Sequence, residues 1–250
     1  MVASTEMSAA YSILINCDLG ESEAQVVDGT QQRILSQIHL ANVCCGAYAG
    51  SEALTLLTMQ QAGEAKVRVG AHPGYPDREH FGRRALFGKQ YNAAQISTLV
   101  AEQVAFAMEA AAKNGLTLYH VKPHGALYNE AASDGAVAEA IAIGVRRVVK
   151  DIFFIGLANS VMVNVFRRQG FVVLRESFAD RRYTSEGLLV PRSAANAMIE
   201  EPAEALEQLE KLVSKSDTVC VHSDSPNALR MLEALKPYCS NLRSAPPAQT

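Results

Sequence analysis

The sequence lacks tryptophan, and only 6% of its residues are aromatic. It also lacks a surplus of positive charge, because 26 acidic residues outnumber 23 lysine and arginine residues that are scattered along the chain. Proteins that bind nucleic acid usually carry a clustered basic face. We therefore expect no nucleic-acid partner.

Long apolar segments are missing as well. No run approaches the roughly 18 apolar residues of a membrane-spanning helix. The stretch from Met1 to Tyr11 contains Glu6 and has neither the basic start nor the continuous apolar core of a signal peptide. We expect a soluble protein with no membrane partner.

Cysteine usage points to a reduced, cytoplasmic compartment. The five cysteines are an odd number and form no CxxC pair. Cys17, Cys44 and Cys220 lie inside apolar runs, where a free thiol behaves as a small hydrophobic side chain. These three are expected in the core.

Several catalytic motifs are absent. The sequence has no GxSxG, HExxH or GxGxxG motif, so serine hydrolases, zincins and Rossmann dehydrogenases lose their main support. The segment from Gly82 to Lys89 resembles a phosphate loop only superficially, since its glycine spacing is too long and Gln90 follows the lysine.

Short apolar runs alternate with stretches of helical spacing throughout the chain, and residues 1–239 are expected to form one domain with a mobile tail at 240–250. The predicted strands are Ser12 to Cys17, His39 to Cys44, Val67 to Ala71, Thr117 to Val121, Ile152 to Gly156, Val172 to Glu176 and Thr218 to Val221. The predicted helices are Glu52 to Glu64, Asp134 to Val149, Asn159 to Gln169 and three that begin near Asn92, Pro202 and Pro226.

This alternation favours an α/β fold of parallel strands with crossover helices. An open doubly wound sheet and a closed barrel both satisfy it. In either fold, ligands bind beyond the carboxyl ends of the strands.

Polar residues gather at these ends. Asn16, Asp18 and Glu21 end the first strand, and two close carboxylates suit an acid/base pair or the ligands of a hard cation. Capping of the next helix is an equally good explanation. His72, after the third strand, fits a general base, a metal ligand or a histidine bonded to a turn carbonyl.

The fourth strand leads into the segment from His120 to Asn129. Strand alternation places His120 and Lys122 on one face. A buried ammonium needs a partner, so Asp18 or a ligand anion must meet Lys122.

Later strand ends add less distinctive groups. Taken singly, Asp180 and Arg181 suggest a surface salt bridge, and His222 suggests a satisfied core histidine. The adjacent pair Arg83 and Arg84 could bind a carboxylate or phosphate, although exposed arginines usually bind neither. The one feature that favours a functional role for these residues is that all of them follow predicted strands.

Eight ordered motifs resemble the lactam-utilisation (LamB/YcsF) family over Ile13 to Leu235: NCDLGE, ANVCCGAYAG, GAHPGYPD, FGRR, HVKPHGALYN, FADRRY, LVPRS and DTVCVHSD. The resemblance implies a distorted seven-stranded (β/α) barrel, TIM-barrel-like and related to deacetylase and glycoside hydrolase barrels. It also implies ATP-dependent opening of 5-oxo-L-proline to L-glutamate with separate B and C subunits. ATP, with Mg²⁺, would be the co-substrate. The oligomeric state is left open, and a homo-oligomer is one option.

By the same resemblance, Asp18, Glu21, His72, Lys122 and His124 would be catalytic. The residues expected to bind substrate are Asn16, Tyr48, Asp77, Arg83, Tyr128, Asp180, Arg192 and His222. Asp18 and His72 are the candidate metal ligands.

The chain departs from the family pattern at Tyr48, where the family usually has a histidine that could ligate a metal. Two segments are also shortened, Ser22 to Gly29 and Ser214 to Ser216. Two alternatives therefore remain. One is a metal-dependent deacetylase or amidohydrolase that acts alone, and the other is a non-catalytic barrel subunit.

Overall fold

A computed structural model describes residues 13–225 and 227–239 of the chain. Its central feature is a closed barrel of seven parallel strands, in which each strand pairs with the next and the last pairs with the first. The strands are β1 (Leu14–Leu19), β2 (Leu40–Cys44), β3 (Arg68–His72), β4 (His120–Val121), β5 (Phe153–Leu157), β6 (Val172–Phe178) and β7 (Thr218–Cys220). The predicted fold class is confirmed, and closure decides between the two architectures that the sequence allowed.

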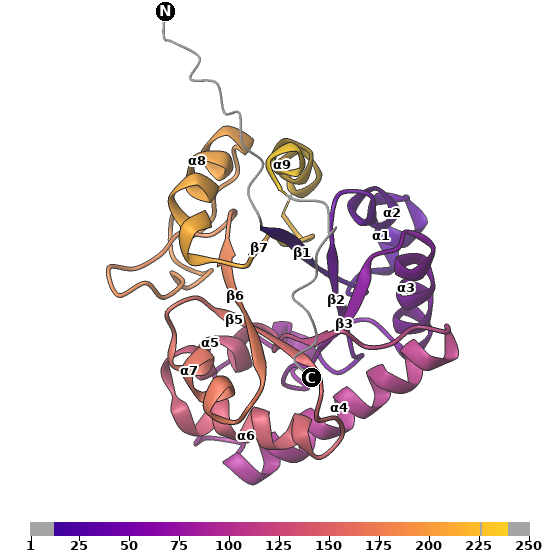
Figure 1. The fold of residues 1–250 in the computed structure, drawn as a ribbon, viewed down its shortest axis with the longest axis vertical. Coiled ribbons are helices and arrows are strands. Elements are labelled where there is room, and N and C mark those ends of the chain that lie inside the picture. The colour runs from indigo at the N-terminus through magenta and orange to yellow at the C-terminus, as the bar shows by residue number, and fades with distance from the viewer. Residues whose placement is uncertain (1–12, 226, 240–250) are drawn as a thin grey trace, which may run out of the picture.

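Helices surround the barrel (Figure 1). They are α1 (Glu23–Val27), α2 (Thr30–Leu35), α3 (Glu52–Glu64), α4 (Ala93–Lys113), α5 (Gly125–Ser133), α6 (Gly135–Arg146), α7 (Val161–Arg168), α8 (Pro202–Leu212) and α9 (Ala228–Leu235), with short 3-10 turns at Arg78–His80, Val213–Lys215 and Lys236–Tyr238. Between β6 and α8, residues 179–201 form a long loop that projects at the left of Figure 1.

The start signals in the sequence explain most helix boundaries. Asn92 and Gln95 form the predicted capping box of α4, and Pro202 opens α8. The predicted start of α9 was wrong, because this helix begins at Ala228 after Asn227. Pro226 and the predicted tail at 240–250 lie outside the described residues.

The barrel interior is layered. Leu40, Ile155 and Leu174 form an apolar cluster inside the barrel that is separate from the main core between sheet and helices. Above it the inward side chains are polar, including Asn16, Asn42 and His120, all with 0% exposure. The strands are therefore not apolar on both faces, because the upper half of the lumen forms the site.

One glycine makes room for this polar layer. A Cβ atom on Gly70 of β3 would lie only 2.2 Å from Nε2 of His120 on the neighbouring strand. The histidine ring therefore occupies the space that any other residue at position 70 would need.

Within the described residues, no helix has both the length and the apolar character required to cross a lipid bilayer.

Candidate active site

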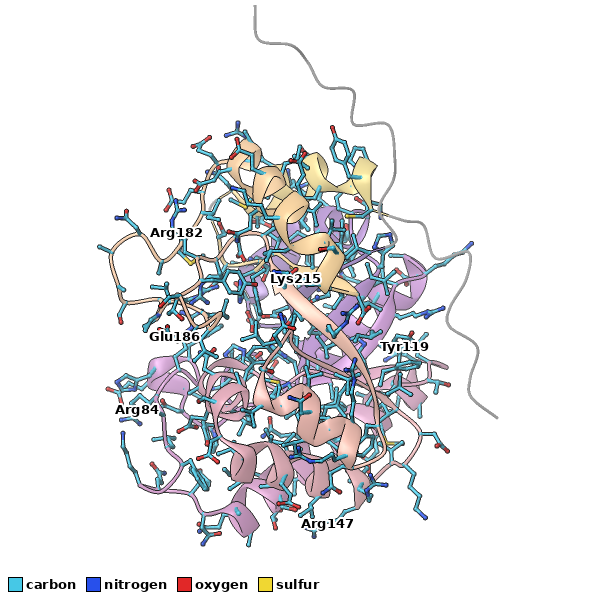
Figure 2. All side chains as sticks on the ribbon, turned by 60° about the vertical axis from the view of Figure 1, so that its left-hand side comes forward. Arg84, Tyr119, Arg147, Arg182, Glu186 and Lys215 are labelled. Atoms are coloured by element: carbon cyan, nitrogen blue, oxygen red, sulfur yellow. The ribbon has the colours of Figure 1, made fainter. Side chains whose placement is uncertain are left out.

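A cavity of about 480 Å³ opens at the carboxyl ends of the strands, a volume typical of small-molecule sites. Figure 2 shows this end of the barrel on its left side: Arg84, Arg182 and Glu186 all follow strand ends and lie there, whereas Tyr119, which precedes β4, lies at the right. The cavity is lined by Asp18, His72, Arg83, Lys122, Pro123, His124, Gly125, Tyr128, Asn129, Phe178, Arg181, Leu189, Pro191, Arg192, Ser193 and His222.

Lys122 lies at the base of this cavity and is 2% exposed. Its Nζ atom is 3.1 Å from Oδ1 of Asp18 and 2.8 Å from Oε1 of Glu176. The same ammonium contacts Oδ1 of Asn16 at 3.2 Å and Sγ of Cys220 at 3.2 Å. Strand alternation correctly predicted that Lys122 points inward. Of the two partners left open for its ammonium, Asp18 and a ligand anion, the structure shows Asp18 in contact.

These contacts fix the charges at the base. Burial alone would raise the pKa of Asp18, but the charges of His72 and Lys122 hold that pKa well below its usual value. Burial opposes the charged form of Lys122, yet Asp18, Cys220 and Glu176 raise its pKa well above the usual value. Asp18 and Lys122 therefore form a buried ion pair.

Two histidines from separate strand ends meet beside Asp18. Nε2 of His72 lies 3.3 Å from Oδ2 of Asp18 and 3.0 Å from Nδ1 of His124. Each ring also contacts a backbone carbonyl oxygen through its other nitrogen, that of Lys122 at 2.7 Å for His72 and that of Phe81 at 2.9 Å for His124. Burial and the charge of His72 lower the pKa of His124 well below its usual value, which favours a neutral ring.

Glu21 completes this cluster from the β1 loop. Its Oε1 atom lies 3.6 Å from Nδ1 of His124 and accepts a hydrogen bond from the Tyr48 hydroxyl at 2.7 Å. Burial and the nearby charge of Asp18 raise the pKa of Glu21 to about 7. One ligand atom from each of Asp18, Glu21, His72 and His124 lies within 4.8 Å of all the others.

A carboxylate orients a third imidazole across the cavity. Oδ2 of Asp180 accepts hydrogen bonds from Nδ1 of His222 at 2.8 Å and from its backbone N–H at 2.9 Å. Burial opposes ionisation of Asp180, but His222 lowers the pKa of that carboxyl group. Because Nδ1 is held by Asp180, Nε2 is the nitrogen free to exchange a proton with a ligand, as in carboxylate–histidine pairs of hydrolases.

Two arginines meet above the cavity. Arg83 and Arg192 both donate to Oδ2 of Asp224, each at 2.6 Å. Burial would raise the pKa of Asp224, but Arg192 and other neighbours lower it to about 2. Arg181 lies nearby, and burial lowers its pKa to about 10. This edge of the cavity therefore offers positive charge to an anionic ligand.

The structure brings together most of the residues that the sequence singled out. Eight of them line the cavity: Asp18, His72, Arg83, Lys122, His124, Tyr128, Arg192 and His222. Four more do not line the cavity but contact residues of the site: Asn16, Glu21, Tyr48 and Asp180. Asp77 belongs to neither group, because Arg84 holds both of its oxygens at 2.8 and 2.9 Å.

Several single-residue interpretations were wrong. Asp180 is completely buried and bonded to His222, so it forms no surface salt bridge with Arg181. His222 lines the cavity and is not a core histidine. Asp18 and Glu21 do not cap α1, whose N-cap is Ser22.

The sequence interpretation missed three contributors. Glu176 and Cys220 contact Lys122, and Asn42 donates to Asp18 at 2.8 Å. Asp224, one of the polar residues after the seventh strand, joins the two arginines. A signal for Glu176 was present: it is two residues before Phe178, so alternation places both on one face of β6. All five cysteines are buried and free. Cys220 belongs to the main core cluster, as predicted, and its Sγ atom also contacts Lys122.

Comparison with known proteins places this geometry in a family context. The LamB/YcsF family matches residues 13–245. A curated protein of Halalkalibacterium halodurans, named as the A subunit of 5-oxoprolinase, is 38% identical over 235 residues, which cover 88% of this chain and 90% of that protein. Another of the same name, from Methylococcus capsulatus, is 39% identical over 241 residues, covering 91% and 92%.

A solved structure agrees with the closed barrel. The crystal structure of a lactam utilization protein from Thermus thermophilus superposes with a TM-score of 0.80 and 32% sequence identity, covering 90% of this chain and 96% of that one.

Proposed function

Because the chain belongs to the LamB/YcsF family, we propose that it is the lactam-opening component of an ATP-dependent 5-oxoprolinase that converts 5-oxo-L-proline to L-glutamate. The observation that carries this proposal is the composition of one cavity. It combines a buried ammonium at its base, an oriented imidazole on its wall and two arginines at its edge. Relatives named as the A subunit of 5-oxoprolinase add support.

The arginines match the carboxylate of the substrate. A 5-oxoproline molecule carries one carboxylate next to its ring nitrogen, and guanidinium groups bind carboxylates through paired N–H donors. Arg83 and Arg192 already hold the carboxylate of Asp224 at the cavity edge. In our proposal they bind the substrate carboxylate in the same region, which directs the lactam ring towards Lys122.

Lactam hydrolysis requires three changes. Water adds its oxygen to the ring carbonyl carbon, the carbon–nitrogen bond breaks, and the leaving nitrogen gains a proton. We assign proton transfer to Asp18, Glu21 and the His222 imidazole, which Asp180 orients. Lys122, with the neighbouring His124, stabilises negative charge as it develops on the carbonyl oxygen.

ATP enters this proposal as a co-substrate, together with Mg²⁺. An amide carbonyl is a poor electrophile. Transfer of the γ-phosphoryl group of ATP to its oxygen releases ADP and makes the carbon a good electrophile, and inorganic phosphate leaves after water has added to that carbon. Part of the machinery that handles ATP is assigned to partner subunits of the B and C type.

A reconstituted complex tests the proposal. We expect ATP-dependent release of glutamate from 5-oxoproline when the chain is combined with B and C subunits, and loss of this activity in the Asp18→Asn variant. Full activity of the variant would remove Asp18 from the mechanism. Activity of the B and C subunits without this chain would refute the proposed role altogether.

The cluster around His72 favours a second candidate, an amidohydrolase that acts alone. A divalent ion held by Asp18, Glu21, His72 and His124 would act as a Lewis acid towards an amide carbonyl. This candidate predicts amide hydrolysis by the isolated chain without ATP, whereas the leading proposal predicts none.

A further inference from the structure

The hydrogen positions on His72 and His124 follow from their neighbours. A carbonyl oxygen only accepts hydrogen bonds, so the ring nitrogen that faces it must carry hydrogen. Nδ1 of His72 faces the carbonyl oxygen of Lys122 at 2.7 Å, and Nε2 of His124 faces that of Phe81 at 2.9 Å. In their neutral forms both rings therefore have bare lone pairs on their other nitrogens.

Those two bare nitrogens point at each other. Nε2 of His72 and Nδ1 of His124 are 3.0 Å apart, and neither neutral ring can donate to the other. Carboxylate oxygens flank them, that of Asp18 at 3.3 Å from His72 and that of Glu21 at 3.6 Å from His124. When both rings are neutral, four electron-rich atoms thus converge in a buried space. Either a hydrogen on Nε2 of His72 or a cation bound between the four atoms would relieve their repulsion.

Lys122 does not supply this charge. Its ammonium contacts the other oxygen of Asp18 and one oxygen of Glu176. Three buried carboxylates and one ammonium leave an excess of two negative charges around the cluster when all are ionised. A second hydrogen on His72 would offset one of these charges, whereas a divalent cation would offset both.

We propose that Asp18, Glu21, His72 and His124 form a binding site for one divalent transition-metal ion, with Zn²⁺ favoured. Two imidazole nitrogens and two carboxylate oxygens are ligands that zinc accepts, and a backbone carbonyl bonded to the opposite ring nitrogen is the usual support of a ligating histidine. Tetrahedral coordination with bonds of roughly 2.0–2.1 Å separates ligand atoms by about 3.3–3.4 Å. Three of the six separations, 3.0, 3.3 and 3.6 Å, lie close to this value, and all six are within 4.8 Å.

Tyr48 acquires a supporting role in this site. Its hydroxyl holds Oε1 of Glu21 at 2.7 Å, and its ring stacks on His124 with centroids 3.6 Å apart. The tyrosine therefore orients two ligands, and the site needs no ligand at position 48. This inference deepens the second candidate function, and its test is independent of both candidates because metal binding is measured without any reaction.

A second group of possible ligands, Asp18, Cys220 and His222, is less suitable. Sγ of Cys220 lies 3.2 Å from the Lys122 ammonium, so an ion there would meet a positive charge directly. Nδ1 of His222 is already bonded to Asp180. The absorption spectrum of bound Co²⁺ distinguishes the two sites, because only coordination by Cys220 gives a thiolate-to-cobalt charge-transfer band.

Titration of chelator-stripped protein with Zn²⁺ and Co²⁺ tests the site. We expect one equivalent to bind and to raise the thermal midpoint, and we expect His72→Gln and His124→Gln each to weaken binding at least 100-fold. His80→Gln is the matched control, since this histidine is half exposed and lies outside the cluster. Circular dichroism in the presence of chelator establishes that each variant is folded.

Three results would overturn the proposal. They are failure of the folded wild-type chain to bind Zn²⁺ or Co²⁺, undiminished binding by both glutamine variants, and a thiolate-to-cobalt band that disappears in Cys220→Ser. None of these depends on whether 5-oxoproline is the substrate.

Discussion

The phenol ring of Tyr48 lies flat against the imidazole of His124, with an interplanar angle of 5°. Its hydroxyl simultaneously donates to Glu21, so one buried side chain orients a carboxylate and an imidazole that come from different loops. The resemblance to the family led us to expect a histidine at this position. The tyrosine removes one possible ligand but fixes the positions of two others.

The Tyr48→Phe variant tests this role. It keeps the stacked ring and removes only the hydrogen bond to Glu21, so we expect the affinity for Zn²⁺ to fall roughly tenfold with little loss of stability. Competition with a chelating dye measures the affinity. Tyr128→Phe is the control, because it removes a phenol hydroxyl from Glu176, on the far side of Lys122. Equal affinities in the two variants would show that Tyr48 does not position a ligand.

The ion pair at the base of the cavity is expected to control stability. Lys122→Met leaves Asp18 and Glu176 buried without their shared ammonium, and removal of one partner from a buried pair costs about 3–5 kcal/mol. Urea denaturation measures this loss.

The double variant Lys122→Met/Glu176→Gln should regain part of that free energy, because it removes one uncompensated charge. It should not regain any activity. If Lys122→Met alone is as stable as the wild type, the carboxylates find other partners and the ammonium has no structural role.

The sequence predicted the barrel better than it predicted the contacts inside it. Seven apolar runs gave all seven strands because each run is buried against helices, a property that hydropathy records directly. The strand expected at Thr117 to Val121 is the exception in length. Only His120 and Val121 pair with β3, so β4 has two residues.

Partners across the lumen were harder to predict, because strand alternation gives the face of a residue but not its opposite neighbour. Asp18 or a ligand anion was expected beside Lys122, since a buried ammonium needs an anionic partner. Glu176 was missed because it lies within β6, and Cys220 because a cysteine in an apolar run resembles core. The contact between His72 and His124 depends on loop conformation over 52 residues of sequence separation, which no local pattern encodes.

Acid stability is expected to depend on His39, which lies outside the active site. Its Nδ1 atom accepts the backbone N–H of Ile15 at 2.9 Å, and burial lowers its pKa to about 4. The unfolded chain, with a histidine pKa near 6.5, binds a proton more readily than the folded chain. Stability should therefore be complete above about pH 6.5 and decrease as the pH falls towards 4.

Urea midpoints between pH 4 and 8 test this prediction. We expect His39→Gln to flatten the acid side of the profile, by roughly 1–2 kcal/mol at pH 4 after allowance for solvent screening. Parallel profiles for the two proteins would show that other groups cause the acid sensitivity.

Arg192 and Arg84 provide a matched pair for the substrate carboxylate. Arg192 lines the cavity and donates a hydrogen bond to Asp224. Arg84, labelled at the left of Figure 2, is paired with Asp77 and is not among the residues that line the cavity. We expect Arg192→Gln to raise the KM for 5-oxoproline at least tenfold with a smaller change in kcat, since it binds the carboxylate equally in the ground state and the transition state. Arg84→Gln should leave KM unchanged.

The neutral analogue 2-pyrrolidinone, which lacks the carboxylate, extends this comparison. If Arg192 binds that group, the analogue should bind wild type and Arg192→Gln with equal, weak affinity, while 5-oxoproline should distinguish them. Calorimetry on the complete complex measures both ligands. A variant that loses affinity for both would show that Arg192 maintains the shape of the cavity. A structural defect weakens the binding of every ligand, whereas loss of a guanidinium weakens the binding of the anion alone.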